Sequence, residues 1–221
     1  MGTILASVLI DEAARRLNDT NNANLRWSGT DLLTSLNSAQ ILVAETRPEA
    51  SIKATAIVMV SGFEQVLPVD GKEFLALVYN AGTDGLLKGS AIIQMQEALL
   101  DAIDGDWRST SPTTTIKYFV PDPDFPVKFS IYPPSDGTNY AHCRYKSIPA
   151  DMATAATAIT IGDEYREPLI LGTLWFALAD ATENIALRTL RKDILNEFRL
   201  SMGVKTANEN QEERKVPGIP I

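Results

Sequence analysis

The spacing of apolar residues changes twice along this chain, and that change limits the folds it can adopt. Near both ends, apolar residues recur at the spacing of amphipathic helices. These helical segments are residues 4–17, 32–44, 163–181 and 183–202. In the middle, short apolar and β-branched runs are typical of strands. These runs are residues 54–60, 65–67, 74–79, 116–120, 127–132 and 141–146. Neither terminal pair of helices can bury its apolar side alone, so we expect the two pairs to pack together.

This order predicts an α+β fold in which an α-helical bundle, made from the N- and C-terminal helices, carries an inserted small β-sheet or β-sandwich lobe. We expect the bundle at residues 1–50 and 163–203, and the β-rich insertion at residues 51–162. The insertion is expected to contain one helix at about residues 89–104. Residues 204–221 end in Pro-Gly-Ile-Pro-Ile and should form an extended C-terminal tail, because they cannot build a core.

Several local signals place the ends of the helices. Thr30 suits an N-cap for the second helix, and Asp31 complements the positive end of its dipole. That helix should end near Arg47, because Pro48 disfavours helical geometry in the residue before it. Gly203 suits the C-terminal cap of the last helix.

The turn residues of the insertion predict how its strands connect. Residues 61–64 separate two apolar runs and indicate a hairpin. Residues 74–79 fit a strand, with a short helix as the alternative. Five of the 12 prolines lie between residues 121 and 134, and we place them at turns and sheet edges. Ile159 and Ile161 fit a final short strand.

The charge balance excludes some partners. The chain of 221 residues has a net charge of −8, which is unsuited to gripping DNA phosphates but suits the lining of a passage that must not hold DNA. Its longest uncharged apolar run, residues 168–179, is shorter than the roughly 20 residues that span a membrane. We find no signal peptide, and expect a soluble, intracellular protein that binds no membrane.

The sequence offers no convincing catalytic or metal site. His142 and Cys143 are the only residues of their kinds, and adjacent residues of a strand face opposite ways, so they should not form a catalytic pair. Asp122, Asp124 and Asp136 could bind Ca²⁺, but they fit turns better and lack the twelve-residue loop pattern of calcium sites. We therefore expect no cofactor and no enzymatic activity.

Two further groups have a structural and a functional interpretation. Asp104 and Asp106 fit solvated turn carboxylates better than an acid–base pair. Trp107 could stack on a ligand, but fits a core position better. The C-terminal part, residues 183–221, has seven basic and six acidic residues, whereas the rest of the chain is strongly acidic. Its basic residues indicate either a solvated helix surface or a docking surface for an acidic partner. On the last helix and its exit they are Arg188, Arg191, Lys192, Arg199 and Lys205.

A series of short motifs resembles one protein family. They are Trp27, Asp31-Leu32-Leu33, Leu36-Asn37-Ser38-Ala39-Gln40, Arg47-Pro48-Glu49-Ala50, Gly62, Gln65, Leu67-Pro68-Val69-Asp70-Gly71, Tyr79-Asn80, Asp106-Trp107, the run from Tyr118 to Pro134, Ile148-Pro149 and Asp163-Glu164-Tyr165. In this order they resemble the head-to-tail adaptor (connector) proteins of tailed bacteriophages, especially short-tailed ones, over residues 1 to about 203. The chain departs from the family at residues 171–180, where a Tyr and an Arg are expected.

The resemblance implies a structural protein of the virion neck or tail, assembled in the host cytoplasm. Such proteins form a ring, usually of twelve copies, between the portal protein and the tail nozzle or tail tube, and a tail fibre is a further candidate partner. DNA passes through the bore without specific binding. The family has an α-helical bundle with an inserted β lobe.

A ring joins two different patches of each subunit, so complementary surfaces are required. We expect subunit contacts at Leu33, Val43, Leu171, Trp175, Arg188 and Arg191. We expect the tail to become ordered along the portal. Its candidate portal contacts are Lys205, Arg214, Lys215, Val216, Pro217, Ile219 and Ile221.

Two other functions stay open on the sequence. The β lobe could be a carbohydrate- or receptor-binding module that uses Trp107, Tyr118, Tyr132 and Tyr140, although aromatic residues in strands usually pack across the sheet. A hydrolase that acts on the cell wall would need an organised pair of carboxylates, which the sequence does not show.

Overall fold

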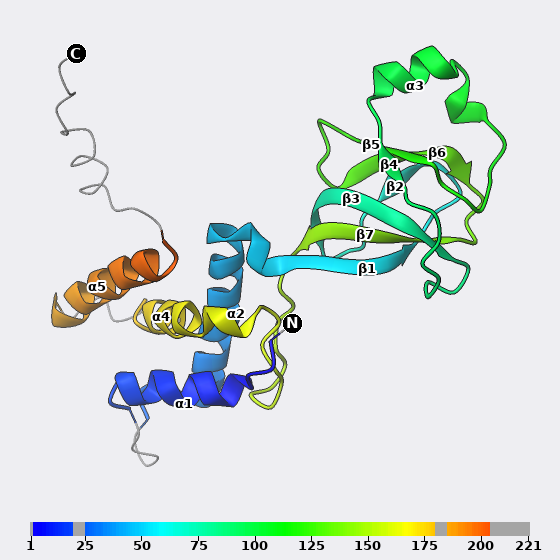
Figure 1. The fold of residues 1–221 in the computed structure, drawn as a ribbon. Coiled ribbons are helices and arrows are strands. Elements are labelled where there is room, and N and C mark those ends of the chain that lie inside the picture. The colour runs from blue at the N-terminus through cyan, green and yellow to red at the C-terminus, as the bar shows by residue number, and fades with distance from the viewer. Residues whose placement is uncertain (1, 20–24, 180–184, 204–221) are drawn as a thin grey trace, which may run out of the picture. The chain divides into compact units, whose positions relative to one another are not determined.

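The computed structural model describes residues 2–19, 25–179 and 185–203 (Figure 1). The fold is mixed α+β, as the sequence predicts. The chain divides into a helical unit, Met1–Ala50 with Pro149–Ile221, and a β unit, Ser51–Ile148. Within the described ranges, none of the helices combines the length and the apolar character needed to cross a membrane.

The helical unit is built around α4, which packs against the other three α-helices. Its elements are α1 (Ala6–Arg16), α2 (Gly29–Thr46), η1 (Pro48–Ser51, which leads into the β unit), η3 (Asp163–Tyr165), α4 (Arg166–Ala177) and α5 (Ile185–Ser201). Every residue of α4 from Pro168 to Leu174 is buried. A Cβ atom at Gly172 would lie 2.9 Å from the Cβ atom of Ala39, so α4 approaches α2 this closely because residue 172 has no side chain.

The ends of α2 and α5 follow local chemistry. The N-cap of α2 is Ser28 and not Thr30: the Ser28 hydroxyl accepts a bond from the Asp31 amide at 3.2 Å, and the Asp31 carboxylate accepts one from the Ser28 amide at 3.0 Å. This reciprocal capping box satisfies two amides that the helix leaves unpaired. At the end of α5, Gly203 has a φ of 65°, which confirms the predicted glycine cap.

The loop after the β unit also belongs to the helical unit. Residues 149–162, which the sequence analysis places in the insertion, contribute Met152, Ile159 and Ile161 to the core of the helical unit. Ile159 and Ile161 do not form the expected strand. Instead, the Ile159 amide donates to the carbonyl oxygen of Ile4 at 2.9 Å, which ties the loop to the start of the chain.

The β unit contains two sheets and one α-helix. The first sheet has the order β1–β7–β3, and the second has the order β2–β6–β5–β4. All neighbouring strands are antiparallel except β4 and β5. The elements are β1 (Ile52–Val58), β2 (Gly62–Val66), β3 (Gly71–Gly82), β4 (Ile93–Gln94), α3 (Glu97–Ile103), η2 (Trp107–Ser109), β5 (Tyr118–Pro121), β6 (Lys128–Ser135) and β7 (Tyr140–Ser147).

The hairpin predicted around residues 61–64 is wrong. β1 pairs with β7, and β2 pairs with β6, so these consecutive strands belong to different sheets. The turn between them is closed by the side chain of Gln65, which accepts a bond from the Val60 amide and donates one to the Val60 carbonyl oxygen, both at 2.7 Å. The Gln65 side chain thus makes the two hydrogen bonds to Val60 that the main chain of a paired strand would otherwise make.

Two further segments differ from the sequence prediction. The helix expected at about residues 89–104 is limited to α3, because the Ile92 amide bonds to the Val78 carbonyl oxygen at 3.1 Å and the next two residues form β4. Pro133 and Pro134 lie inside β6 rather than in a turn. Residues 74–79 do form a strand, as part of β3.

Strand alternation shows the layers of the β unit. In β5, Phe119 belongs to the core shared by both sheets, whereas Val120 belongs to a second cluster with Leu100 of α3 and Trp107 of η2. Adjacent residues of a strand face opposite sides of a sheet. The two sheets therefore form a sandwich, and α3 with η2 covers the outer side of the second sheet.

Candidate interaction surfaces

His142 and Cys143, the two residues considered as a catalytic pair, lie on opposite sides of the first sheet. Cys143 faces the core of the β unit, where burial raises the pKa of its thiol to about 12. His142 faces the other side of the sheet and stacks on Tyr79, with 4.6 Å between ring centres. The two side chains thus point in opposite directions, as the sequence predicts.

The aspartates of the predicted turns act on the backbone. The Asp122 carboxylate accepts bonds from the amides of Asp124 and Phe125, at 2.9 and 3.0 Å. Asp136 holds the amide of Thr138 at 2.9 Å. Among the residues with assigned positions, no group of three or more His, Cys, Asp or Glu side chains could hold a metal ion.

The four aromatic residues of the carbohydrate hypothesis do not form one platform. Trp107 is only 1 % exposed, and its Nε1 donates to the Asp101 carboxylate at 2.8 Å. Tyr118 and Tyr132 stack on each other across the second sheet, with 6.2 Å between ring centres. Tyr140 lies in β7 of the first sheet. These contacts match the packing roles that aromatic residues usually have in sheets.

The subunit-contact candidates of the helical unit differ in exposure. Val43 and Leu171 are 0 % and 4 % exposed, so they build the core of this unit and offer a neighbour almost no surface. Leu33 and Trp175 pack at the edge of the same core and are partly exposed. Arg188 is exposed on α5. The predicted contact surface therefore keeps accessible side chains at Leu33, Trp175, Arg188 and Arg191, but not at Val43 and Leu171.

Arg191 of α5 binds Trp175 of α4 and so joins the two helices. The Arg191 Nε donates to the carbonyl oxygen of Trp175 at 3.1 Å, and its guanidinium carbon lies 4.6 Å from the centre of the Trp175 ring. Stacking and a hydrogen bond from one guanidinium fix the side chain more firmly than either contact alone. The pair is half-buried and joins α5 to α4 in the helical unit.

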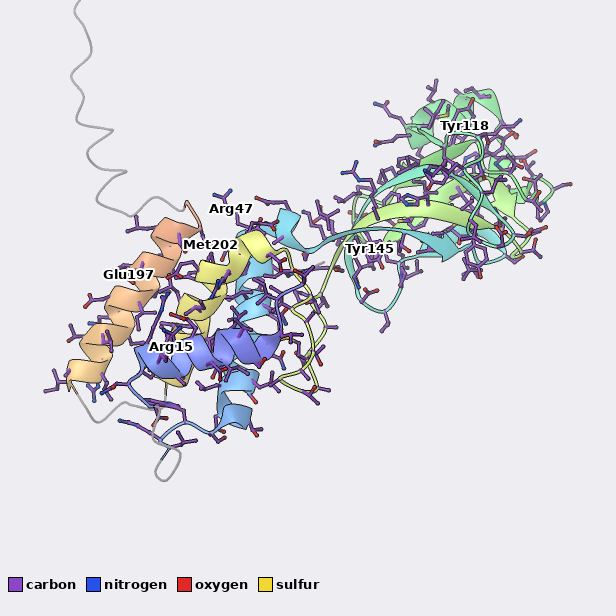
Figure 2. All side chains as sticks on the ribbon, turned by 60° about the horizontal axis from the view of Figure 1, so that its bottom comes forward. Arg15, Arg47, Tyr118, Tyr145, Glu197 and Met202 are labelled. Carbon is purple, nitrogen blue, oxygen red and sulfur yellow. The ribbon has the colours of Figure 1, made fainter. Side chains whose placement is uncertain are left out.

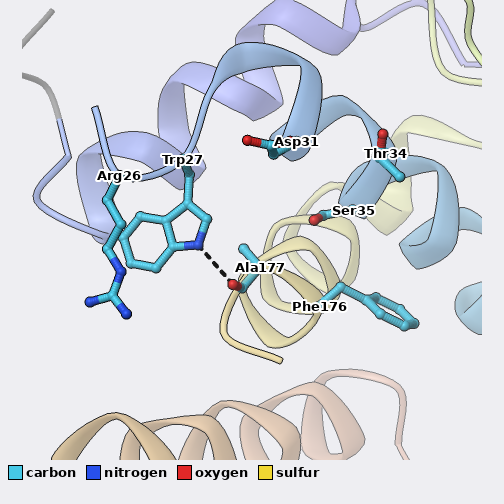
Figure 3. A pocket seen from close by; sticks show the side chains of 7 residues that line it. All are labelled: Arg26, Trp27, Asp31, Thr34, Ser35, Phe176 and Ala177. Atoms are coloured by element: carbon cyan, nitrogen blue, oxygen red, sulfur yellow. Dashed lines mark hydrogen bonds between the residues drawn. The ribbon is translucent and has the colours of Figure 1, made fainter. Parts of the chain in front are cut away.

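A pocket lies beside Trp27, among residues that the sequence does not mark as a site (Figure 3). Its volume is about 420 Å³, and its lining includes Arg26, Trp27 and Phe176. Trp27 is held by its Nε1, which donates to the Ala177 carbonyl oxygen at 2.7 Å. The Arg26 guanidinium lies 4.8 Å from the centre of the Trp27 ring. Residues from α4 and from the start of α2 are far apart in sequence, so only the fold reveals the pocket.

The candidate portal contacts Lys205, Arg214, Lys215, Val216, Pro217, Ile219 and Ile221 lie outside the described residues. The structure does describe the point from which this segment leaves. Arg47 donates from its Nε to the carbonyl oxygen of Met202 at 2.8 Å, and Nη2 binds the same oxygen (Figure 2). A Cβ atom at residue 203 would lie 2.7 Å from that Nη2. Arg47 and Gly203 therefore fit together and fix the end of α5 beside the end of α2.

Comparison with models of known protein families gives a match. The family model described as SU10 adaptor protein matches residues 5–217. The match spans both units and continues beyond α5 into the C-terminal segment. A search of curated proteins finds no match.

Proposed function

Because this chain belongs to the SU10 adaptor family of bacteriophage head-to-tail adaptor proteins, we propose that it forms a ring between the portal and the tail nozzle or tail tube. Adaptors of this family are structural proteins of the virion neck. The observation that carries the proposal is the family match over nearly the whole chain, including the segment after α5. The ring has about twelve copies, assembles in the host cytoplasm and leads DNA through its bore without catalysis, in line with the resemblance.

The charge of the chain supports a passage for DNA. Each copy has a net charge of −8, and a ring multiplies that charge around one bore. DNA phosphates are repelled by such a wall, so the DNA slides through without being held. A strongly basic bore would have the opposite effect.

A closed ring needs contacts between two different surfaces of each copy. In the helical unit, the partly exposed Leu33 and Trp175 and the exposed Arg188 form candidates for one such surface, with Arg191 holding Trp175 in place. The stacked arginine and tryptophan are residue types that dominate binding energy in many interfaces. A tail fibre remains a further candidate partner.

The C-terminal segment is proposed to bind the portal. It starts directly after Gly203, whose position Arg47 fixes at the end of α5. Lys205, Arg214 and Lys215 supply positive charge, and the final Val, Pro and Ile residues supply apolar contacts. An extended segment that binds along a partner covers much surface for its length.

The test uses purified portal protein and the full-length chain in co-sedimentation. The full chain is expected to sediment with the portal, whereas a variant that lacks residues 204–221 keeps its melting temperature and loses binding. Lys215→Glu is expected to weaken binding, whereas the control Lys128→Glu, at the exposed first residue of β6, is expected to leave it unchanged. Unchanged binding by the shortened variant would contradict the role of the segment, and no binding by the full chain would contradict the adaptor function.

A further inference from the structure

The outer side of the first sheet has the character of a binding surface. In β7, Ala141, Cys143 and Tyr145 face the core, so Tyr140, His142 and Arg144 face outward. We define the sheet face as the outward residues of β1 and β7. They are Ile52, Ala54, Ala56, Val58, Tyr140, His142, Arg144 and Lys146, of which Lys146 is paired with Glu73 of β3. Val58 is 56 % exposed and Ile52 is 38 % exposed, so apolar surface reaches solvent along the edge strand β1.

The cross-strand register places Arg144 on this face between two alanines. Arg144 lies between Ala54 of β1 and Ala76 of β3, and neither neighbour has a polar side chain. Arg144 is exposed and makes no ion pair with any residue whose position is described. The next row places His142 between Ala56 and Tyr79, where it stacks on Tyr79. Arginine and tyrosine are among the residue types that dominate binding energy at protein interfaces.

A fixed loop adds an apolar rim to the sheet face. A Cβ atom at Gly85 would lie 3.3 Å from both Ala56 and Tyr140, so the loop after β3 rests on this side of the sheet. The Leu86 amide bonds to the Asp84 carboxylate at 2.9 Å, which holds the loop in shape. Leu86 and Leu87 are 83 % and 58 % exposed.

The opposite side of the β unit has the complementary chemistry. We define the α3 surface as residues 97–108, which include four acidic residues and one basic residue, Arg108. Arg108 binds Glu97 and Asp101, so the surface keeps a negative charge. Leu99 and Ile103, one helical turn apart, are 52 % and 63 % exposed. The α3 surface is therefore acidic with an apolar stripe.

The layers of the β unit place these two surfaces on opposite sides. The sheet face is the outer side of the first sheet, and α3 packs on the outer side of the second sheet (Figure 1). Two complementary surfaces on opposite sides of one body make head-to-tail contacts that continue from copy to copy. Pairing of β1 with β1 of another copy would instead use the same surface twice and stop at a dimer.

We propose that the sheet face of one copy binds the α3 surface of the next copy around the ring. In this contact Arg144 meets the acidic residues of α3, and the exposed apolar side chains of β1 beside Arg144 cover Leu99 and Ile103. The inference rests on the ring of the proposed function and assigns one of its interfaces to the β unit. The β unit thus contributes to ring closure as well as to contacts with other neck proteins.

Sedimentation velocity of the full-length chain over rising concentration tests this contact. Arg144→Glu alters only the sheet face, and Ile103→Arg alters only the α3 surface. Both residues are exposed, so the variants are expected to keep the melting temperature of the wild type. Each variant alone should associate at least about tenfold more weakly than the wild type. The control Lys128→Glu, outside both surfaces, should associate like the wild type.

Mixing the two variants gives the sharpest result. The Arg144→Glu chain keeps an intact α3 surface and the Ile103→Arg chain keeps an intact sheet face, so the mixture has one working contact and should stop at a dimer of unlike chains. Such a dimer also shows that both variants are folded. If the wild type associates and Arg144→Glu associates equally well, the proposed contact is wrong but the proposed ring is not contradicted. If the wild type stays monomeric at every concentration, both the contact and the ring are contradicted.

Discussion

The helical unit and the β unit obtain their cores from the chain in different ways. The helical unit joins α1 and α2 to α4 and α5, which lie more than a hundred residues later, whereas the β unit uses the continuous segment Ser51–Ile148. Each unit has its own cluster of buried residues. A chain built in this way can keep one unit intact while the other is altered, which suits a protein that contacts several partners.

The largest expected effect comes from emptying either core. Phe198 of α5 and Phe129 of β6 are 3 % and 1 % exposed. Phe198→Ala should destabilise the helical unit, and Phe129→Ala the β unit, each by about 3–5 kcal/mol, because both leave a cavity. Calorimetry should show two unfolding transitions, with each substitution lowering a different one. If both substitutions lower the same single transition, the two cores are not independent.

A smaller effect is expected at the close approach of α4 and α2. Gly172→Ala would place a Cβ atom 2.9 Å from that of Ala39, so the helices must move apart. We expect a loss of about 1–3 kcal/mol in the helical transition only. Gly29→Ala is the matched control, because a Cβ atom at residue 29 meets no atom within 4 Å. Equal melting temperatures of the two variants would show that the helix contact tolerates a methyl group.

The N-cap of α2 should contribute less to the stability of the helical unit than the contact of α4 with α2. Ser28→Ala removes the hydroxyl that accepts a hydrogen bond from the Asp31 amide. This loss should destabilise the helical unit by about 1 kcal/mol. Thr30→Ala serves as the control, because residue 30 lies inside the first turn of α2 and not at its N-cap. Chemical denaturation of both variants measures the difference. A larger loss for Thr30→Ala would favour the cap that the sequence alone suggests.

The smallest effect is a pH dependence that differs between the units. The Thr3 hydroxyl donates to Asp163 at 2.6 Å and lowers the pKa of that carboxyl below its ordinary 3.8. In the β unit, the bond from Trp107 Nε1 lowers the pKa of Asp101. A lowered carboxyl pKa stabilises the fold above the ordinary value, and that stability is lost as the pH falls through the folded value.

Melting curves from about pH 7 to about pH 2.5 measure this dependence. Asp163→Asn should reduce the fall in melting temperature of the helical transition at acid pH. Asp101→Asn should do the same for the β transition. An effect of Asp163→Asn on the β transition would contradict the separation of the units.

The comparison also explains what the sequence could predict. Helices depend on contacts between near residues, so their periodicity placed α1, α2, α4 and α5 correctly, and Pro48 and Gly203 marked two of their ends. Strand pairing depends on distant residues. The pattern around residues 61–64 is therefore compatible with a hairpin, although β1 pairs with β7. The helix before Gly105 was overextended because hydrogen bonds to β3 and β5 override a helical apolar pattern.

Surfaces were harder to predict than elements. Apolar character alone does not separate a core residue such as Val43 from a partly exposed one such as Leu33 on the same helix. The Trp27 pocket and the sheet face both depend on residues that the fold brings together from separate segments. The family resemblance, in contrast, was carried by the order of short motifs, and the family match confirms it.

Electron cryo-microscopy of the neck of the virion tests most directly whether copies of this chain form the proposed ring between head and tail. The account predicts a closed ring between portal and tail into which both the helical unit and the β unit fit, with the sheet face of each copy against α3 of the next. A neck whose density leaves no place for these two units would contradict it.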